Sequence, residues 1–184
     1  MSDEQDAALV EAARGGDQDA WEQLYRRVYP RLRAYLARRV GDAGVEDVVN
    51  ETMTRAVAGI GRMRLGPAGF DGWLFGIARH VAADHHRRNR RSERHVAATF
   101  VAGGALEVEA EPGVELLLAE DHARVRRAFD ALRPEQRELL ELRVIAGLSA
   151  EQTAAVLGKR AGAVRTAQSR ALQRLRELLE HDDG

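Results

Sequence analysis

Apolar positions recur every three to four residues along most of the chain, which is the spacing of one face of an α-helix. Such stripes cover three ranges of the N-terminal half: 21–36, 45–57 and 73–82. Asp17 precedes the first stripe and can cap a helix, whereas Gly41 and Gly44 interrupt the pattern before the second. Together the stripes predict a small bundle of about four amphipathic helices.

The last third of the chain carries the boundary signals of several helices. Pro134 suits the first turn of a helix that runs to a cap at Gly147. Ser149 and Gln152 have the spacing of a capping box, which opens the next helix, and Gly158 ends that helix. A longer basic helix follows. A short helix, a tight turn with glycine and a longer basic helix form the layout of a helix-turn-helix motif.

Between these two helical parts the sequence changes character. The stretch HVAATFVAGGALEVEAEPGVE, residues 95–115, has glycines, a proline and acidic side chains but no sustained periodicity. This composition is typical of a flexible linker. We therefore predict an all-α protein of two small helical domains, residues 1–94 and 120–184, joined by a flexible acidic linker, residues 95–119.

The net charge of −1 hides a strong segregation of charge along the chain. Residues 95–121 include six acidic residues and neither lysine nor arginine, whereas residues 159–176 include six basic residues and no acidic one. In the stretch DHHRRNRRSER, residues 84–94, five arginines accompany two acidic residues. Two basic surfaces separated by an acidic connector favour binding to a polyanion such as nucleic acid.

Composition argues against several other classes. The chain has no cysteine, so it has neither disulfides nor a thiolate zinc site. Its first stretch, MSDEQDAALVEAARGG, is acidic and lacks the apolar core of a signal peptide. No apolar run is long enough to cross a bilayer. We expect a cytoplasmic protein without membrane insertion, metal or cofactor.

The arginine-rich stretch 84–94 allows three interpretations. It could be a solvated helix end, a metal site formed by Asp84, His85 and His86, or a surface for a polyanion. Adjacent histidines on a helix point about 100° apart, so they do not converge on one metal ion. We favour the polyanion surface, because arginines neutralise phosphates and polar or aromatic groups of the preceding loop can hold an unstacked base.

The basic helix of the helix-turn-helix segment has a polar outer face. Four of its side chains are predicted to point outward: Arg165, Thr166, Ser169 and Arg170. Arginine forks match guanine edges and phosphates. Arg165 lies nearer the N-terminal end of the helix, which usually enters the DNA groove, so we expect it to read bases. The alternative is an ordinary helical hairpin with a solvated arginine face.

Three segments of the chain resemble bacterial sigma factors of the extracytoplasmic-function (ECF) group. The segment DAWEQLYRRVYPRLRAYLARRVGDAGVEDVVNETMTRA is similar to the start of their region 2, and FDGWLFGIARHVAADHHRRNRR is similar to its end. The segment ALRPEQRELLELRVIAGLSAEQTAAVLGKRAGAVRTAQSRALQRLRE is similar to their region 4. The segments follow the family's order, with a linker between the two regions, and the resemblance covers nearly all of the chain.

The resemblance implies a partner or a DNA element for each segment. The clamp coiled coil of the β′ subunit of core RNA polymerase would be bound by Asp47, Val48, Asn50, Glu51 and Met53. The −10 promoter element would be melted and read by Arg62, Arg64, Phe70, Trp73, Arg79, His80, Arg87, Arg88 and Arg91. The −35 element would be read by Arg160, Arg165, Thr166, Ser169 and Arg170. Region 4 would also touch the β flap, and an anti-sigma factor is a further candidate partner.

The chain departs from the family's usual residues in both regions. Asn50 and Met53 stand where glutamine and phenylalanine are usual in the clamp-binding helix. Arg160, Ala167 and Gln168 stand where serine, arginine and leucine are usual in the DNA-reading helix. The base contacts at the −35 element therefore need not be the family's common set.

The resemblance implies a transcription initiation factor without catalytic chemistry of its own. It would give core polymerase promoter specificity and help to open the duplex. The alternative is a stand-alone helix-turn-helix regulator whose N-terminal bundle dimerises or senses a signal. An enzyme, such as a hydrolase using His80, Asp84 and His85, ranks third, because neither a nucleophile nor an oxyanion site accompanies these residues.

Overall fold

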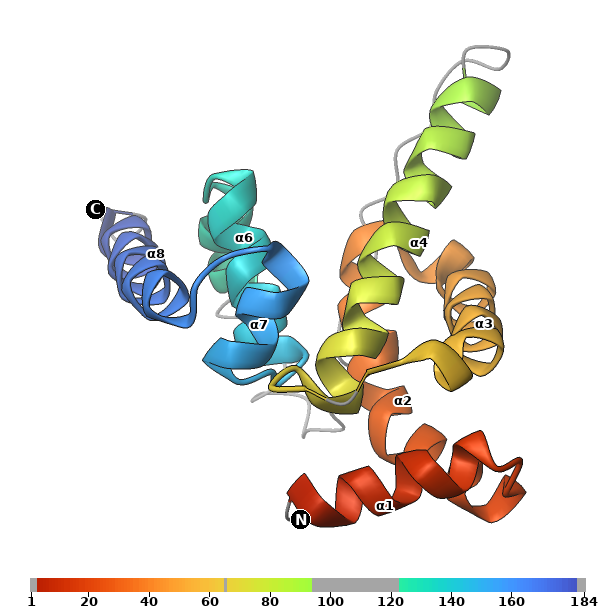
Figure 1. Ribbon diagram of the computed structural model, residues 1–184. Helices are drawn as coiled ribbons and strands as arrows, with labels where there is room; N and C mark the ends of the chain where they lie inside the picture. The colour runs from red at the N-terminus through yellow and green to blue at the C-terminus, as the bar shows by residue number, and fades with distance from the viewer. Residues whose placement is uncertain (1–2, 65, 94–122, 182–184) are drawn as a thin grey trace, which may run out of the picture.

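The computed structural model describes residues 3–64, 66–93 and 123–181 (Figure 1). The N-terminal part contains α1 (Asp3–Arg14), α2 (Gln18–Val40), α3 (Asp42–Gly59), the short 3-10 helix η1 (Ile60–Arg62) and α4 (Gly69–Glu93). The C-terminal part contains a helix over residues 123–130, α6 (Pro134–Leu140), the π-helical turn η2 (Glu141–Ile145), α7 (Ala150–Leu157) and α8 (Ala161–His181).

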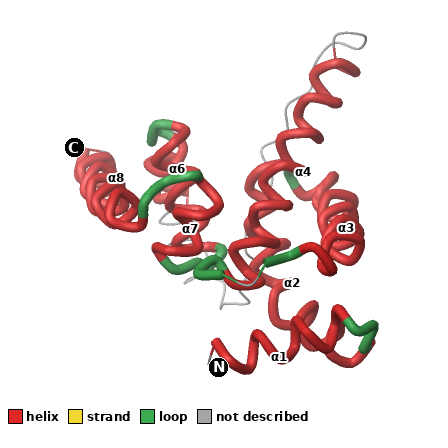
Figure 2. The backbone as a smooth tube through the Cα atoms, viewed as in Figure 1, coloured by secondary structure: helices red, strands yellow, loops and turns green. Residues whose placement is uncertain are grey.

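Helices and loops make up the whole of the described ranges, as Figure 2 shows, and the predicted all-α class is confirmed. The predicted linker, residues 95–119, lies outside the described residues. Among the helices that the structure does describe, none combines the length and the apolar character needed to cross a membrane.

Helix ends in the N-terminal part follow local signals. The Asp17 side chain accepts a hydrogen bond from the Ala20 amide at 3.0 Å and caps α2 as predicted. Gly41 separates α2 from α3 with a φ of 78°, a left-handed value that glycine adopts without strain. Gly44 was predicted to break the pattern as well, but it lies inside α3. Its missing side chain makes room for His85, because a Cβ there would lie 3.2 Å from the His85 ring.

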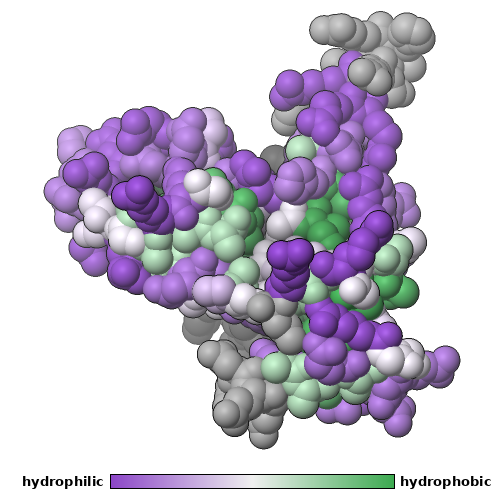
Figure 3. All heavy atoms as spheres, viewed as in Figure 1, coloured by the Kyte–Doolittle hydropathy of each residue, from purple (hydrophilic) through white to green (hydrophobic). Residues whose placement is uncertain are grey.

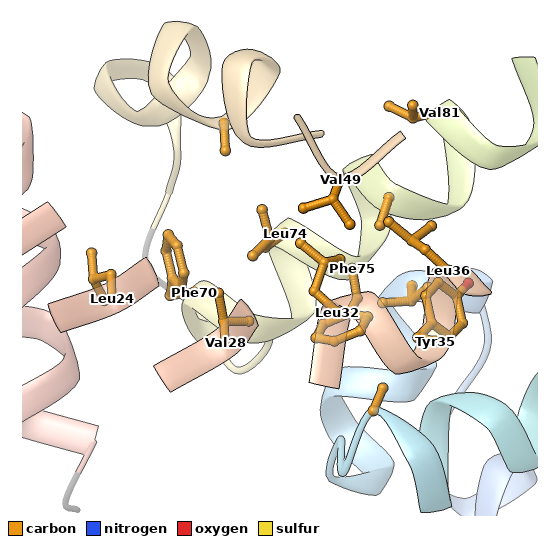
Figure 4. Packing of buried hydrophobic residues seen from close by; sticks show 14 of the residues in the cluster. Leu24, Val28, Leu32, Tyr35, Leu36, Val49, Phe70, Leu74, Phe75 and Val81 are labelled. Atoms are coloured by element: carbon orange, nitrogen blue, oxygen red, sulfur yellow. The ribbon is translucent and has the colours of Figure 1, made fainter. Parts of the chain in front are cut away.

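The N-terminal core forms where α2, α3 and α4 pack together. Figure 4 shows apolar side chains of these helices meeting there: Leu24, Val28, Leu32, Tyr35, Leu36, Val49, Phe70, Leu74, Phe75 and Val81. Tyr35 and Phe75 are fully buried and meet edge to face, with ring centroids 5.4 Å apart. Burying one apolar side chain of this size contributes about 1.5–3 kcal/mol. The helix α1, which the sequence did not predict, adds Val10 and Ala13 to this core.

Two positions of the predicted apolar stripes are exposed rather than buried. Tyr25 is 38% exposed and Val57 is 55% exposed. Each directly follows a fully buried residue, Leu24 or Ala56, and therefore lies about 100° around the helix from it. The stripes are thus narrower than the sequence pattern indicated.

Turn signals in the C-terminal part are confirmed. The Ser149 hydroxyl accepts from the Gln152 amide at 3.1 Å, and the Gln152 side chain accepts from the Ser149 amide at 2.8 Å. This capping box opens α7, and Gly158 ends it in a left-handed conformation. The helix-turn-helix layout therefore rests on contacts between near neighbours in the sequence.

The helix that begins at Pro134 differs from its predicted form. The sequence predicted one helix up to Gly147, but the α-helical part ends at Leu140 and widens into η2. In this wider turn the Ala146 amide donates to the Glu141 carbonyl at 2.9 Å. Glu141 is buried along this turn.

The C-terminal part packs directly against the N-terminal bundle. Leu142, Ala146, Leu148 and Val156 belong to the same buried cluster as residues of α2, α3 and α4. In Figure 1, α7 lies beside the start of α4, and a Cβ built on Gly72 would be 3.5 Å from Gln152. The two helical parts therefore share apolar packing, which the sequence did not predict.

Candidate nucleic-acid and partner interfaces

The outer face of α3 carries the residues that the sequence predicted to bind a partner. Asp47 and Asn50 are exposed, and Glu51 and Met53 are partly exposed. Val48 is only 1% exposed because it lies on the core side of the helix, so its side chain is not available to a partner. The outer face thus presents two carboxylates and an amide.

A chain of ion pairs joins α3 to α4. Glu51 accepts from Arg55 at 2.6 Å and from Arg88 at 2.9 Å, and the Arg88 hydrogen bond is the main cause that lowers the pKa of Glu51. Arg55 also lies 3.3 Å from Asp84, which pairs with Arg87, and the Arg87 hydrogen bond lowers the pKa of Asp84. Arg87 and Arg88 are exposed, so these pairs are screened by water and either arginine can exchange its carboxylate for a phosphate.

A hollow of about 570 Å³ opens between α3 and α4. Its lining residues are Arg55, Gly59, Arg62, Trp73, Ile77, His80 and Asp84. Three predicted −10 residues therefore meet here, namely Arg62, Trp73 and His80. Trp73 packs close to Gly59, where a Cβ would lie 3.2 Å from its ring, and His80 Nδ1 lies 2.7 Å from the Gly76 carbonyl oxygen. The hollow combines an aromatic ring with hydrogen-bonding and cationic side chains.

The remaining −10 residues are placed differently from one another. Arg64 is exposed in the loop before α4. Phe70 is 1% exposed, and its ring lies 6.4 Å from Trp21 and 5.9 Å from Trp73, so it supports Trp73 from inside. Arg91 belongs to the end of α4, and its side chain falls outside the described part of the chain. Figure 3 shows hydrophilic residues along this projecting end of α4.

Arg79 of α4 is held by the C-terminal part. It donates to Glu138 of α6 at 2.9 Å, and Glu138 also accepts from Arg39 of α2 at 3.3 Å. Arg39 reaches the buried Glu141 at 2.8 Å. Burial opposes ionisation of Glu138, but the hydrogen bond from Arg79 and the charge of Arg39 outweigh it and lower the pKa of Glu138. Burial raises the pKa of Glu141 despite the charge of Arg39.

The two neighbouring histidines of α4 do not converge on a common point. The rings of His85 and His86 have centroids 6.4 Å apart and an angle of 75° between their planes. Asn89 Nδ2 lies 3.0 Å from His85 Nε2. Within the described ranges, no group of three His, Asp or Glu side chains has the arrangement of a metal site.

The helix α8 places its two outward arginines on different flanks. Arg165 faces α7 and donates to Glu151 at 2.9 Å. Arg170 lines a hollow of about 480 Å³ at the start of α6, which it shares with Ala131, Arg133, Gln136, Gln173, Arg174 and Glu177. The sequence did not indicate Arg133 or Arg174 as part of this surface, because Arg133 lies in the turn before α6 and carries no local signal.

The unusual residues of α8 divide into inner and outer positions. Gln168 accepts a hydrogen bond from Arg143 at 2.8 Å, and Ala167 packs against the C-terminal apolar cluster. Arg160 is exposed just before the helix, and Thr166 and Ser169 are exposed along it. Of the three unusual residues in the DNA-reading segment, Ala167 and Gln168 therefore affect packing, and Arg160 affects the outer face.

Both helical parts match known protein families. The sigma-70 region 2 family matches residues 24–92, and the sigma-70 region 4 family matches residues 122–175. The ECF RNA polymerase sigma factor BldN of Streptomyces coelicolor is 38% identical over 175 residues, which cover 95% of this chain and 66% of BldN. The ECF sigma factor SigD of Mycobacterium tuberculosis is 35% identical over 182 residues, which cover 96% of this chain and 85% of SigD. This chain belongs to the ECF sigma factors.

As an ECF sigma factor, the protein directs RNA polymerase to promoters and has no enzymatic activity of its own. The match to region 2 decides against the stand-alone regulator, because a free helix-turn-helix protein has no need of a polymerase-binding region. The region 4 match includes the helix-turn-helix of α7 and α8, which binds DNA.

Two solved structures of similar proteins share this fold. CnrH, solved in complex with the cytosolic domain of CnrY, matches with a TM-score of 0.68 and 26% identity, covering 96% of this ECF sigma factor and 98% of CnrH. The sigma factor RpoE of Bartonella quintana, solved with the anti-sigma factor NepR, matches with a TM-score of 0.67 and 27% identity, covering 87% and 96% of the two chains. Each match includes regions 2 and 4 together.

Proposed function

We propose that this ECF sigma factor binds core RNA polymerase through the outer face of α3. Asp47, Asn50 and Glu51 would contact the clamp coiled coil of the β′ subunit, and the partly exposed Met53 would add an apolar contact. Val48 would contribute only from inside, by packing α3 onto the core. Region 4 would make a second contact, with the β flap.

The hollow between α3 and α4 is proposed to receive an unstacked base of the −10 element. Trp73 offers a ring for stacking, and Arg62 and His80 offer hydrogen bonds at its rim. The exposed Arg64, Arg87 and Arg88, with Arg91, would neutralise nearby phosphates. Arg79 would join them once Glu138 has moved away.

The outer face of α8 is proposed to read the −35 element. Arg160, Arg165, Thr166 and Ser169 would enter the major groove, since the N-terminal end of a recognition helix usually contacts the bases. Arg170 would bind the DNA backbone together with Arg133 and Arg174, because these three arginines surround one hollow beside the helix.

The organisation of the chain and its regulation complete the proposal. We place the domains at residues 1–94 and 120–184, with the acidic linker at 95–119, and each family match lies within one domain. An anti-sigma factor is proposed as a regulator because RpoE, which has a similar fold, was solved with NepR. The protein would act in the cytoplasm, where core polymerase works.

The proposal depends above all on one observation, the presence in one chain of an exposed acidic face on region 2 and a basic recognition helix in region 4. Run-off transcription with purified core polymerase on a promoter library tests it. We expect specific transcripts only when both proteins are present, and we expect Trp73→Ala to abolish them on duplex templates. The exposed Arg26→Ala serves as the matched control. Duplex binding by the chain alone, without any transcript, would refute the proposal.

A further inference from the structure

Arg14, the last residue of α1, connects this helix by hydrogen bonds to η1, the turn that precedes the loop before α4. Its Nε donates to the Ile60 carbonyl at 3.0 Å, and a terminal nitrogen donates to the Met63 carbonyl. Glu11, one turn earlier in α1, holds the same guanidinium at 2.5 Å. Ile60 begins η1 and Met63 caps it, so one side chain spans the whole 3-10 turn.

This turn carries two of the residues proposed to meet the −10 element. Ile60 and Met63 are buried, whereas Arg62 and Arg64, on either side of Met63, are exposed. Arg62 lines the hollow that also contains Trp73. The backbone position of the turn therefore decides where both arginines point.

The turn has little internal support. A 3-10 turn has weaker hydrogen-bond geometry than an α-helix, and the end of a helix leaves carbonyls without intrahelical partners. The Met63 amide donates to the Ile60 carbonyl at 3.1 Å, and the Arg14 fork supplies two further donors. Arginine suits this role because its planar guanidinium presents several donors in a fixed arrangement, whereas lysine is a single flexible point charge.

We infer that Arg14 is a positioning residue for promoter recognition, through which α1 fixes the turn 60–63 so that Arg62 and Arg64 meet the −10 element. The inference rests on the proposed function of this loop. It extends the −10 site to a helix that precedes the region 2 match, which begins at residue 24.

The variant Arg14→Ala should keep α1 in place. Val10 and Ala13 are buried in the core, and Asp6 pairs with Arg27 of α2. These contacts hold the helix independently of Arg14. The substitution therefore tests the position of the turn rather than the docking of α1.

The test is a selection over randomised −10 sequences, using holoenzyme with wild type, Arg14→Ala, Arg14→Lys, Arg62→Ala, Arg64→Ala or the control Arg26→Ala. We expect Arg14→Ala to reduce −10 discrimination about tenfold, the loss that follows when one good base contact is misplaced. Arg14→Lys should retain part of the discrimination, and Arg26→Ala all of it. The −35 preference and the affinity for core polymerase should not change. In the free protein, hydrogen exchange of the Met63 amide should become faster in Arg14→Ala.

Three outcomes would overturn the inference. If Arg62→Ala or Arg64→Ala flattens the −10 preference and Arg14→Ala does not, α1 does not position the turn, and the proposed −10 site stands. If Arg14→Ala lowers transcription from all promoters alike and also weakens core binding, its role is only to stabilise the fold. If none of the three alanine variants changes the −10 preference, the proposed role of this loop fails, and the inference fails with it.

Discussion

Neutralising Glu138 should weaken the contact between region 2 and region 4. The substitution Glu138→Gln keeps the shape of the side chain but removes the charge that faces Arg39 and Arg79. A hydrogen bond to a charged group contributes about 1.5–3 kcal/mol when well shielded. Arg39 keeps Glu141 as a partner, so the loss falls mainly on Arg79, whose side chain is 38% exposed. We call the arrangement closed when the C-terminal part packs against the N-terminal bundle, and open when the two parts are separated. The substitution should cost the closed form about 1–2 kcal/mol, which is roughly a tenfold shift towards the open form.

Energy transfer between two fluorescent labels measures this shift in the free protein. The chain has no cysteine, so cysteines introduced at the exposed Ala58 of α3 and Ala163 of α8 would be the only labelling sites. Added salt screens the ion pairs, and Glu138→Gln should lose transfer at a lower salt concentration than wild type. Glu135→Gln, an exposed position of the same helix, is the matched control and should behave as wild type does.

Identical salt titrations for wild type, Glu138→Gln and Glu135→Gln would refute this reasoning. The ion pairs of Glu138 would then contribute nothing measurable, and the domains would be held together by other contacts, such as the Arg39–Glu141 pair and the apolar packing of Leu142 and Leu148. In that case Arg79 would be available to DNA without any change in Glu138.

Three further predictions concern pH, polymerase binding and promoter specificity. Burial raises the pKa of Glu141, so the closed form binds its proton more tightly than the open form does, and closure should strengthen as the pH falls from neutral towards 4.5, the ordinary carboxyl value. Glu141→Gln should abolish this trend in the same fluorescence assay. A trend that persists in this variant would contradict the prediction. Reversing the charge at Asp47 and Glu51 to lysine should reduce co-purification with core polymerase at unchanged helicity, and unaltered co-purification would remove the clamp assignment. In a selection over randomised −35 sequences, Arg165→Ala should cost about 1–3 kcal/mol at one base pair, whereas Arg170→Ala should weaken all promoters alike and make the salt dependence shallower. If both variants keep the wild-type preference, α8 does not read bases through these arginines.

Helix ends were predictable from the sequence because their contacts are local. The Asp17 cap, the Ser149–Gln152 box and the Gly158 turn each join residues within a few positions of one another. The spacing of residue types is then enough to indicate the structure. The same holds for the outward positions of α8, since helical periodicity alone separates Arg165 from Val164.

Contacts between distant segments could not be predicted in this way. The Arg79–Glu138 pair and the tie between Arg14 and Met63 leave no periodic or compositional trace. The resemblance assigned Arg62, Trp73 and His80 to the −10 element, but it did not predict that they line one hollow. That depends on how α3 packs on α4. Periodicity conflicts with the resemblance at Val48, which lies in an apolar stripe but was assigned to polymerase binding, whereas Phe70 lies outside the stripes and had only the −10 role that the resemblance implies. The structure buries both.

The pair formed by Glu51 and Arg88 has a thermodynamic consequence for the order in which ligands bind. One member lies on the surface proposed for polymerase and the other on the surface proposed for DNA. If polymerase engages Glu51 as proposed, Arg88 would lose its intramolecular counterion and become a better ligand for phosphate. Linkage requires the reverse effect to be of equal size, so bound promoter DNA would raise the affinity of the protein for polymerase by the same factor. Because the pair is exposed and worth at most about 1 kcal/mol, this coupling would make the protein a few-fold better DNA ligand inside the holoenzyme than by itself.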